Sequence, residues 1–301
     1  MKTYSRVDEI PSGKAVGGLT PGCLILEGGA WRGIYTQGAL DAMMQEGVNI
    51  QTTIGVSAGA MSGLAYAAGQ IGRSARFNLT YRHDDRYMGR TALHDNHGIT
   101  GFQFVFSESE KLMPLDQEAF NDPARRFVVT GTDIETGRNA FFEKGKTPDM
   151  FQAIRASATV PYVSEPVEVE GRKYLDGGIA CKIPLNWALE QNFDKIMIIR
   201  TRDRKYRKTP SAVKNVVRAE YRKYPELLRD LEEEAPNYNL LLDRIDSLER
   251  EGRIHVLAPS EPVTIGRFEG NMEKLGELYW RGYNDARADM EAMKAYFGIT
   301  E

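Results

Sequence analysis

A serine flanked by two glycines is the strongest sign of chemistry in this sequence. Gly55 and Gly59 surround Ser57 in the pattern G-x-S-x-G. The β-branched and apolar run 52–56 predicts a buried strand, and the small residues of 58–69 predict a helix that begins close to a sheet. A sharp strand-to-helix turn of this kind presents its serine hydroxyl at the sheet edge, so Ser57 is predicted to be a nucleophile.

A glycine-rich loop, residues 28–33, precedes this serine in the chain. A serine that attacks an ester creates a tetrahedral oxyanion, which backbone N–H groups must stabilise. The loop follows a predicted strand at 23–26 and opens a predicted helix over 34–46, so several of its N–H groups lack helical partners. It matches neither G-x-G-x-x-G nor G-x-x-x-x-G-K-[ST], which argues against a dinucleotide or phosphate loop. Arg32 either steadies the loop or meets an anionic head group, and structural support is the expected role.

The nucleophile also needs a base, and the sequence offers two kinds. A Ser-Asp-His triad needs a histidine after the acid, and His255 is the only histidine late in the chain. Asp176 is the other candidate, because it ends a predicted hairpin and is followed by Gly177 and Gly178. Asp-Gly-Gly is also an ordinary turn sequence, so the local pattern alone does not decide between them.

Two strand–loop–helix units in succession predict a parallel sheet with helices packed on it. Further strands are predicted at 126–133, 138–143, 166–170, 172–175, 195–201 and 253–258. Helices are predicted at 73–88, 149–157 and 185–191, in the charged region 209–252 with interruptions at Pro225 and Pro236, and along an apolar stripe over 272–297. Residues 91–98 are predicted to form a loop.

Composition limits the class of protein. The 301 residues are 42% hydrophobic and 27% charged, as in ordinary globular proteins, and the net charge of −3 gives no attraction to nucleic acid. Cys23 and Cys181 have no metal-like spacing, and two thiols predict a reducing compartment. No apolar run approaches the ~20 residues of a membrane span, and no apolar segment follows the N-terminal residues. We therefore predict a cytoplasmic protein that needs no metal or cofactor.

Four landmarks occur in order: the loop 28–33, the elbow around Ser57, the run Ala-Ser-Ala-Thr-Val-Pro at 156–161, and Asp-Gly-Gly at 176–178. Together they resemble the patatin-like phospholipases over about residues 22 to 200. The resemblance implies a three-layer α/β/α sandwich with a mainly parallel central sheet. It also implies hydrolysis of lipid carboxylic esters, of the phospholipase A or lysophospholipase kind, by a Ser–Asp dyad without histidine.

Carried over to this chain, the resemblance makes Ser57 the nucleophile and Asp176 the base. The backbone around Gly28, Gly29 and Ala30 then forms the oxyanion hole, although the family usually has a third glycine where Ala30 stands. The supporting residues are Arg32, Gly33, Gly55, Gly59, Gly177 and Gly178. Two alternatives stay open, namely a histidine-dependent esterase that uses His255 and a scaffold that binds lipid or a partner without catalysis.

The resemblance divides the chain into three parts. We predict a flexible lead-in over 1–21, a catalytic domain over 22–208, and a mainly helical extension over 209–301 that packs on it. The segment 200–208 is strongly basic. It is either a solvated loop or a patch that brings the protein to an anionic membrane surface.

Overall fold

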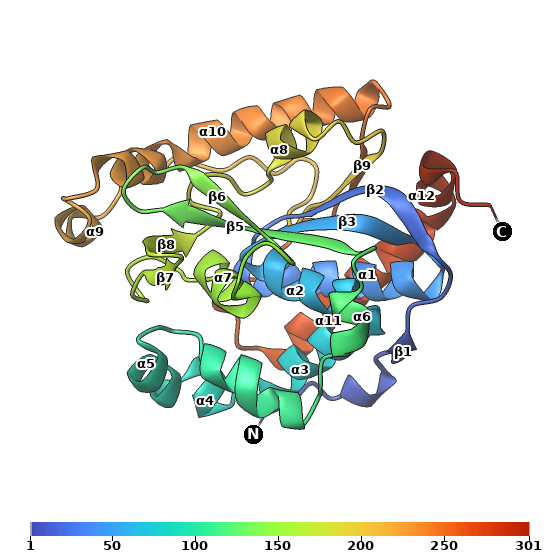
Figure 1. Ribbon diagram of the computed structural model, residues 1–301, viewed down its shortest axis with the longest axis horizontal. Coiled ribbons are helices and arrows are strands. Elements are labelled where there is room, and N and C mark those ends of the chain that lie inside the picture. The colour runs from blue at the N-terminus through green and yellow to red at the C-terminus, as the bar shows by residue number, and fades with distance from the viewer. Residues whose placement is uncertain (1, 301) are drawn as a thin grey trace.

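An eight-stranded sheet with helices on both faces forms the centre of the computed structural model, which describes residues 2–300 (Figure 1). The strand order is β10-β9-β2-β3-β5-β8-β7, and β6 pairs with β5. The strands are β2 (Leu19–Leu26), β3 (Asn49–Val56), β5 (Arg126–Asp133), β6 (Asn139–Glu143), β7 (Val167–Val169), β8 (Arg172–Asp176), β9 (Ile196–Ile199) and β10 (His255–Leu257). The pairs from β10 to β5 are all parallel, whereas β6 and β8 run antiparallel to β5. The prediction of a mainly parallel α/β sheet is confirmed.

The helices form two outer layers. The long α10 (Pro225–Arg250) and α8 (Leu185–Glu190) cover one face, and α1 (Gly33–Gln45), α2 (Ala58–Ala67) and α11 (Met272–Ala288) lie on the other (Figure 1). The remaining helices are α3 (Arg73–Tyr81), α4 (Asp85–Met88), α5 (Arg90–Asn96), α6 (Gln117–Asn121), α7 (Met150–Ser157), α9 (Asn215–Glu220) and α12 (Met290–Phe297). Short elements complete the chain: 3₁₀ turns at Val7–Glu9, Ala30–Arg32 and Ser109–Lys111, a π-helical turn at Phe104–Glu108, and a small sheet of β1 (Gly13–Lys14) with β4 (Gln70–Ile71).

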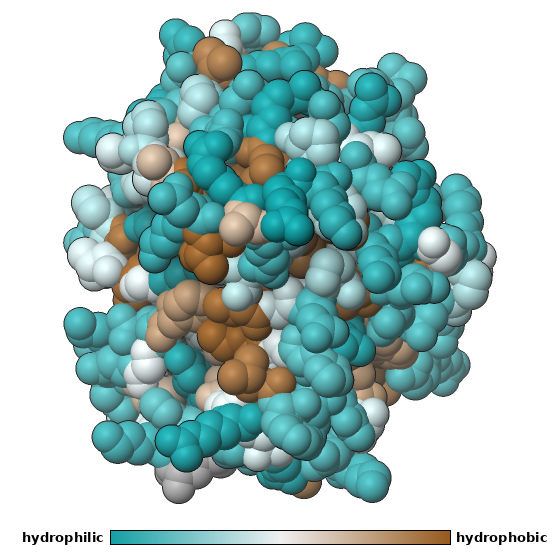
Figure 2. All heavy atoms as spheres, turned by 90° about the vertical axis from the view of Figure 1, so that its left-hand side faces the viewer, coloured by the Kyte–Doolittle hydropathy of each residue, from teal (hydrophilic) through white to brown (hydrophobic). Residues whose placement is uncertain are grey.

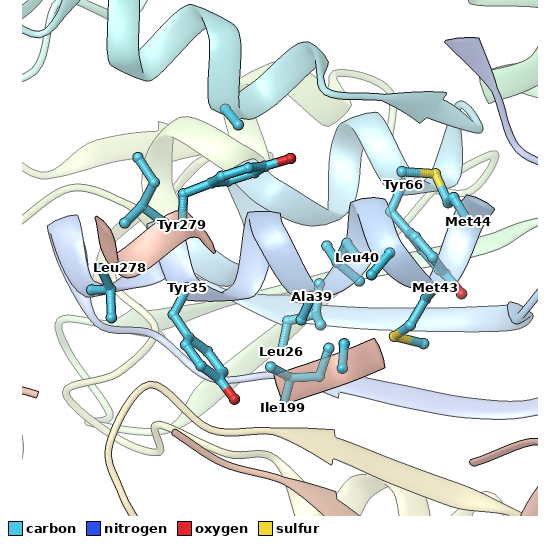
Figure 3. Close-up of a cluster of buried hydrophobic side chains, with 14 of the residues drawn as sticks. Leu26, Tyr35, Ala39, Leu40, Met43, Met44, Tyr66, Ile199, Leu278 and Tyr279 are labelled. Carbon is cyan, nitrogen blue, oxygen red and sulfur yellow. The ribbon is translucent and has the colours of Figure 1, made fainter. Parts of the chain in front are cut away.

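The helix α1 is buried between the sheet and α11. Leu26 and Ile199 from the sheet lie beneath it, and Tyr279 of α11 lies on its other side (Figure 3). A methyl group on Gly38 of α1 would lie 2.0 Å from the carbonyl oxygen of Tyr279, so the two helix backbones are in direct contact. Because β10 also joins the central sheet, residues 209–301 contribute both an edge strand and part of the core. Where one folding unit ends and another begins stays a prediction.

Two residues of the predicted flexible lead-in, Tyr4 and Ile10, are packed into the core, while most of that segment is exposed. Tyr4 and Ile10 are almost completely buried, and the N–H of Tyr4 donates a 3.0 Å hydrogen bond to the carbonyl of Leu79. The ring of Tyr4 occupies the space above Gly276, where a Cβ atom would lie only 2.1 Å away. These partners are more than seventy residues distant in sequence, so the polar composition of the segment did not reveal them.

Four helical predictions differ from the structure. The helix predicted at 73–88 is divided into α3, which ends at Tyr81, and α4, which starts anew after the Asp84 side chain accepts a hydrogen bond from the N–H of Arg86. Residues 91–98, predicted as a loop, contain α5, because the carboxylate of Asp85 accepts hydrogen bonds from the N–H groups of Arg90 and Thr91 where that helix begins. The helix α10 continues through Pro236, which lies on its exposed side, where water can satisfy the carbonyl that lost its partner. The predicted closing helix is broken at Asp289 into α11 and α12. No helix within residues 2–300 is long and apolar enough to cross a membrane.

Candidate active site

Two strands meet end to end along one edge of β5. The parallel strand β3 pairs with β5 up to Val56 opposite Thr130, and the antiparallel strand β8 takes the next position with Asp176 opposite Gly131. Both strands therefore end at the same point from opposite directions. As a result Ser57, directly after β3, lies next to Asp176, at the end of β8, and the Ser57 hydroxyl donates a 2.5 Å hydrogen bond to Asp176 Oδ2.

The backbone at Ser57 has the strained geometry expected of an elbow. Ser57 has φ 54° and ψ −121°, a conformation that non-glycine residues adopt at a cost of about 1–3 kcal/mol. The turn is possible because Gly55 and Gly59 have no side chains that would collide with neighbouring backbone. A Cβ atom on Gly59, for example, would lie 2.3 Å from the carbonyl oxygen of Leu26. The N–H of Ser57 donates a 2.9 Å hydrogen bond to the hydroxyl of Ser157, which holds the turn in place.

Asp176 is fixed by its backbone and is partly buried in the wall of a pocket. Its N–H donates to the carbonyl of Thr159 at 2.8 Å, and its own carbonyl accepts the hydroxyl of Thr132 at 2.8 Å. Burial raises the pKa of the carboxyl group, while the hydrogen bond from Ser57 and the nearby Lys182 ammonium oppose that rise. The net direction is upward, so Asp176 is a stronger base than an aspartate in water.

The glycine-rich loop lies directly against the serine. A Cβ atom on Gly28 would lie 3.2 Å from Ser57 Cβ, and one on Gly29 would lie 2.6 Å from the hydroxyl of Thr201. Ala30 adopts a left-handed backbone with φ 49°. Among residues 2–300, no acceptor lies within hydrogen-bond distance of the N–H groups of Gly29 and Ala30. The loop therefore has two free donors close to the nucleophile.

The other predicted supporting residues surround this pair. A Cβ atom on Gly33 would lie 2.8 Å from Ala58 Cβ, so this glycine lets α1 and α2 begin side by side. Gly177 fits against the Thr130 side chain, and the N–H of Gly178 donates to Asp176 Oδ1 at 2.8 Å. Arg32 lies on the wall of the pocket beside the serine.

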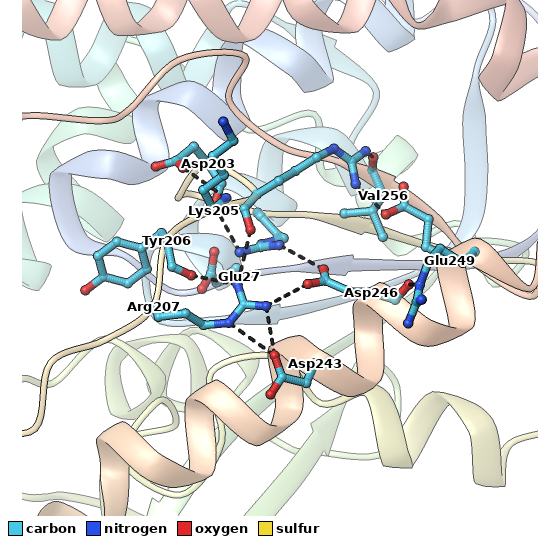
Figure 4. A network of polar contacts seen from close by, with 12 residues as sticks. Glu27, Asp203, Lys205, Tyr206, Arg207, Asp243, Asp246, Glu249 and Val256 are labelled. Atoms are coloured by element: carbon cyan, nitrogen blue, oxygen red, sulfur yellow. Dashed lines mark hydrogen bonds and ion pairs between the residues drawn. The ribbon is translucent and has the colours of Figure 1, made fainter.

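A buried carboxylate that the sequence analysis missed anchors the glycine-rich loop. Glu27, at the end of β2, accepts hydrogen bonds from the Thr201 N–H at 2.5 Å and from the Tyr238 hydroxyl on α10. Figure 4 shows Glu27 in the middle of a polar network between the sheet and α10. No local motif marks Glu27, because its partners lie more than 170 residues away.

Two open pockets meet at Ser57. One, of about 660 Å³, is mainly apolar and is lined by Ile34, Met61, Tyr87, Phe102, Val160 and Phe268. The other, of about 620 Å³, has a lining that is about equally polar and apolar, and we call it the polar pocket because its charged residues are Arg32, Asp176, Lys182, Glu234 and Arg267. Ser57 and Arg267 lie on the walls of both pockets, as do Ala30 and Val160, whereas Asp176 lies on the wall of the polar pocket only. The arrangement separates a space for a hydrocarbon chain from a space for a polar group.

The geometry places His255, the base of the alternative prediction, away from Ser57. His255 begins β10, whereas the site lies at the carboxyl ends of the parallel strands. Its Nε2 atom lies 2.5 Å from Asp289 Oδ2 at the break between α11 and α12. No histidine lines either of the pockets at Ser57. Within residues 2–300, no three histidine, cysteine or acidic side chains are placed to hold a metal ion.

The basic segment 200–208 is held against α10 rather than left free. Arg200 is completely buried, and the guanidinium of Arg207 donates to Asp243 and Asp246 at 2.8 Å (Figure 4). Arg204 pairs with Glu249, and Lys208 pairs with Glu234. The structure therefore does not support the prediction of a free cationic patch in this segment.

The fold and site are those of an α/β protein with a serine on a nucleophile elbow and an aspartate as its partner. The family model described as patatin-like phospholipase matches residues 24–189, so the chain belongs to the patatin-like phospholipase family. This confirms the resemblance drawn from the sequence. A second model, a domain of unknown function named DUF6363, matches residues 224–298.

Similar proteins agree with this assignment. The uncharacterized protein YjjU of Escherichia coli K12 is 27% identical over 200 residues, which cover 65% of this chain and 56% of that protein. The probable lipid hydrolase 463L of invertebrate iridescent virus 6 is 27% identical over 189 residues, which cover 57% of this chain and 64% of that protein. The chain thus matches less than two thirds of the length of these relatives. The crystal structure of VipD from Legionella pneumophila has a TM-score of 0.50 at 14% identity, covers 95% of this chain and 70% of that one, and shows the shared fold.

Proposed function

We propose that the protein is a serine acyl hydrolase that cleaves carboxylic esters of lipids through a dyad of Ser57 and Asp176. The observation that carries the proposal is the 2.5 Å hydrogen bond from the strained Ser57 to the partly buried carboxylate of Asp176. Direct contact with a carboxylate of raised pKa replaces the imidazole that a triad would use.

In the first half of the reaction, Asp176 accepts the hydroxyl proton as Ser57 Oγ attacks the ester carbonyl carbon. The carbonyl oxygen becomes an oxyanion, and the free N–H groups of Gly29 and Ala30 are the donors we assign to it. The tetrahedral intermediate then releases the alcohol, which takes its proton from the Asp176 carboxyl. An acyl group remains bound to Ser57.

In the second half, water replaces the alcohol. Asp176 accepts a proton from the water molecule, and the resulting hydroxide attacks the acyl carbon in the same donor site. The intermediate collapses, the proton returns to Ser57, and the free fatty acid leaves. The same two side chains therefore serve both halves, and no other titratable group is needed.

The pockets favour a lipid ester over a small polar ester. We assign the acyl chain to the apolar pocket, whose lining suits a hydrocarbon, and the alcohol portion to the polar pocket, which also opens at Ser57. Phe268 on the first pocket and Tyr162 on the second are 45% and 46% exposed, so apolar surface continues from the pockets to the outside.

We also propose that this outer surface contacts a lipid interface. On the face of the molecule turned toward the viewer in Figure 2, hydrophobic side chains gather in the middle and hydrophilic ones surround them. Contiguous exposed apolar surface with a polar rim is typical of a site that meets another apolar phase. This proposal assigns the membrane contact to apolar residues such as Phe268 and not to the paired arginines of 200–208.

A fluorophosphonate probe tests the central part of the proposal, because it reacts only with an activated serine. We expect the wild-type protein to be labelled on Ser57 and the Ser57→Ala variant to be unlabelled. Ser62→Ala is the matched control, since Ser62 is a buried serine on α2, the helix that follows Ser57. Its hydroxyl donates to the carbonyl of Ala58 and accepts a 3.3 Å hydrogen bond from Gln37 Nε2, and it has no carboxylate partner. An unlabelled wild-type protein would instead favour a scaffold that binds lipid without catalysis.

A further inference from the structure

The polar pocket beside Ser57 carries more positive than negative charge. Arg32 and Lys182 come from the segment that matches the patatin model, and Arg267 comes from the segment that matches DUF6363. The carboxylates on its wall are Asp176 and Glu234. The balance between these groups decides what kind of ligand the pocket can accept.

Glu234 is already neutralised by lysines. Its carboxylate lies 2.7 Å from Lys182 Nζ and also pairs with Lys208. Burial would raise the pKa of Glu234, but the two ammonium groups outweigh burial and lower that pKa to about 2. Glu234 is therefore ionised at neutral pH, holds Lys182 at the pocket wall, and cannot also neutralise the arginines.

The arginines have no such partner. Within residues 2–300, neither Arg32 nor Arg267 forms an ion pair with a carboxylate. The buried Nε of Arg32 has no hydrogen-bond acceptor. Burial, together with repulsion from Arg202 and Arg267, lowers the pKa of Arg32, although attraction to the Glu27 carboxylate opposes that fall. Two guanidinium groups on the wall of one pocket, neither of them in an ion pair, supply the positive charge and the N–H donors that a phosphate group accepts.

We propose that Arg267, with Arg32 and Lys182, binds the phosphate group of the ester's alcohol portion, so that the segment 224–298 supplies one of the three basic residues of the head-group subsite. The inference rests on the proposed hydrolase function, which places the acyl chain on the apolar side of Ser57 and the alcohol on the polar side. It gives the segment of unknown function a role at the site, because Arg267 determines specificity for phosphate-bearing esters while Glu234 positions Lys182.

The test compares two esters with the same acyl chain, a monoacylglycerol and its 3-phosphate. We expect wild-type kcat/KM to be at least about tenfold higher for the phosphate-bearing ester. Arg267→Gln should reduce that preference by about tenfold or more, as expected when a charge-assisted hydrogen bond is lost. Arg287→Gln removes the same charge at an exposed position of α11 that lines neither pocket, and should keep the wild-type preference.

The outcomes separate this inference from the proposed function. Equal kcat/KM for the two esters in the wild type, or an equal loss on both in Arg267→Gln, would overturn the phosphate subsite while the hydrolase stands. If the wild type cleaves neither ester and takes no fluorophosphonate label, the hydrolase itself fails.

A second experiment measures how two anions inhibit the hydrolysis of a p-nitrophenyl ester. We expect glycerol 3-phosphate to inhibit this hydrolysis more strongly than inorganic phosphate does. Equal inhibition by the two compounds would mean that the pocket binds free phosphate, and would overturn the proposal that it binds the head group of a lipid.

Discussion

Tyr238 on α10 donates a hydrogen bond to the buried carboxylate of Glu27, which stands at the base of the glycine-rich loop. The same carboxylate accepts the N–H and the hydroxyl of Thr201, against which Gly29 is packed. A helix from the C-terminal part of the chain thus holds the loop that we assign to the oxyanion. The position of the two free N–H donors depends on contacts that extend well beyond the local motif.

The contact predicts the effect of Tyr238→Phe. The change removes a hydrogen bond to a buried charge, which is worth about 1.5–3 kcal/mol. We expect a lower Tm and a lower kcat on a short-chain p-nitrophenyl ester, because the glycine-rich loop loses one of its supports. The control is Tyr206→Phe, because the ring of Tyr206 lies next to that of Tyr238. Its hydroxyl makes no hydrogen bond within residues 2–300, so the change should alter neither Tm nor kcat. Wild-type kcat and Tm for Tyr238→Phe would show that Glu27 does not position the loop.

The pairing of Arg207 with α10 predicts a structural role for the basic segment. Arg207→Ser removes contacts to Asp243 and Asp246 at a partly exposed site, where such pairs contribute up to about 1 kcal/mol. We expect Tm to fall by roughly 2 °C and binding to anionic vesicles to stay at the wild-type level. The control is Lys205→Ser, which removes an exposed charge that forms no ion pair in the described chain. If Arg207→Ser binds vesicles more weakly and keeps the wild-type Tm, the basic segment acts as a free cationic patch and the prediction is wrong.

Asp41 predicts a pH dependence of stability. It is buried on α1, where it accepts hydrogen bonds from the N–H of Gly72 at 2.7 Å and the hydroxyl of Tyr279 at 2.9 Å. Burial raises the pKa of Asp41 to about 7, against about 3.9 in an unfolded chain. The folded protein therefore keeps a proton that the unfolded chain releases, so this contribution to stability is complete below about pH 4 and is lost as pH rises toward 7.

The measurement is Tm between pH 4 and pH 8 for the wild type and for Asp41→Asn, whose side chain cannot ionise. We expect the decline of Tm between pH 4 and pH 7 to be shallower in the variant than in the wild type. Asp8→Asn, an exposed carboxylate near the N-terminus, is the control for the loss of one charge. Parallel curves for the wild type and Asp41→Asn would show that Asp41 does not hold its proton in the folded state.

The sequence was sufficient where chemistry depends on neighbours in the chain. The elbow at Ser57 and the Asp-Gly-Gly turn at Asp176 are local patterns, because each needs small residues at fixed positions beside the reacting group. The parallel strands were also predicted, since continuous apolar runs and short loops follow from burial on both faces. The register that brings Val56 and Asp176 to adjacent positions on β5 is the structural reason that these two patterns form one site.

Residues whose role depends on long-range contacts were missed. Glu27, Lys182 and Arg267 lie in no recognisable motif, and each acquires its role from a partner on another element. The basic segment shows the converse, because its composition resembles a free charged surface while the carboxylates that neutralise it lie on α10. The amino-acid composition gives the number of charged residues but does not show which of them form ion pairs.

The central claim is that Asp176, and no histidine, is the base for Ser57. The most direct measurement is kcat/KM on a short-chain p-nitrophenyl ester for Asp176→Asn beside His255→Gln, with circular dichroism to establish that both variants are folded. An amide cannot accept the serine proton, so we predict that Asp176→Asn loses about 10²–10⁴-fold or more, while His255→Gln keeps most of the wild-type activity. A folded and active Asp176→Asn variant beside a folded His255→Gln variant that has lost a thousandfold would contradict the dyad.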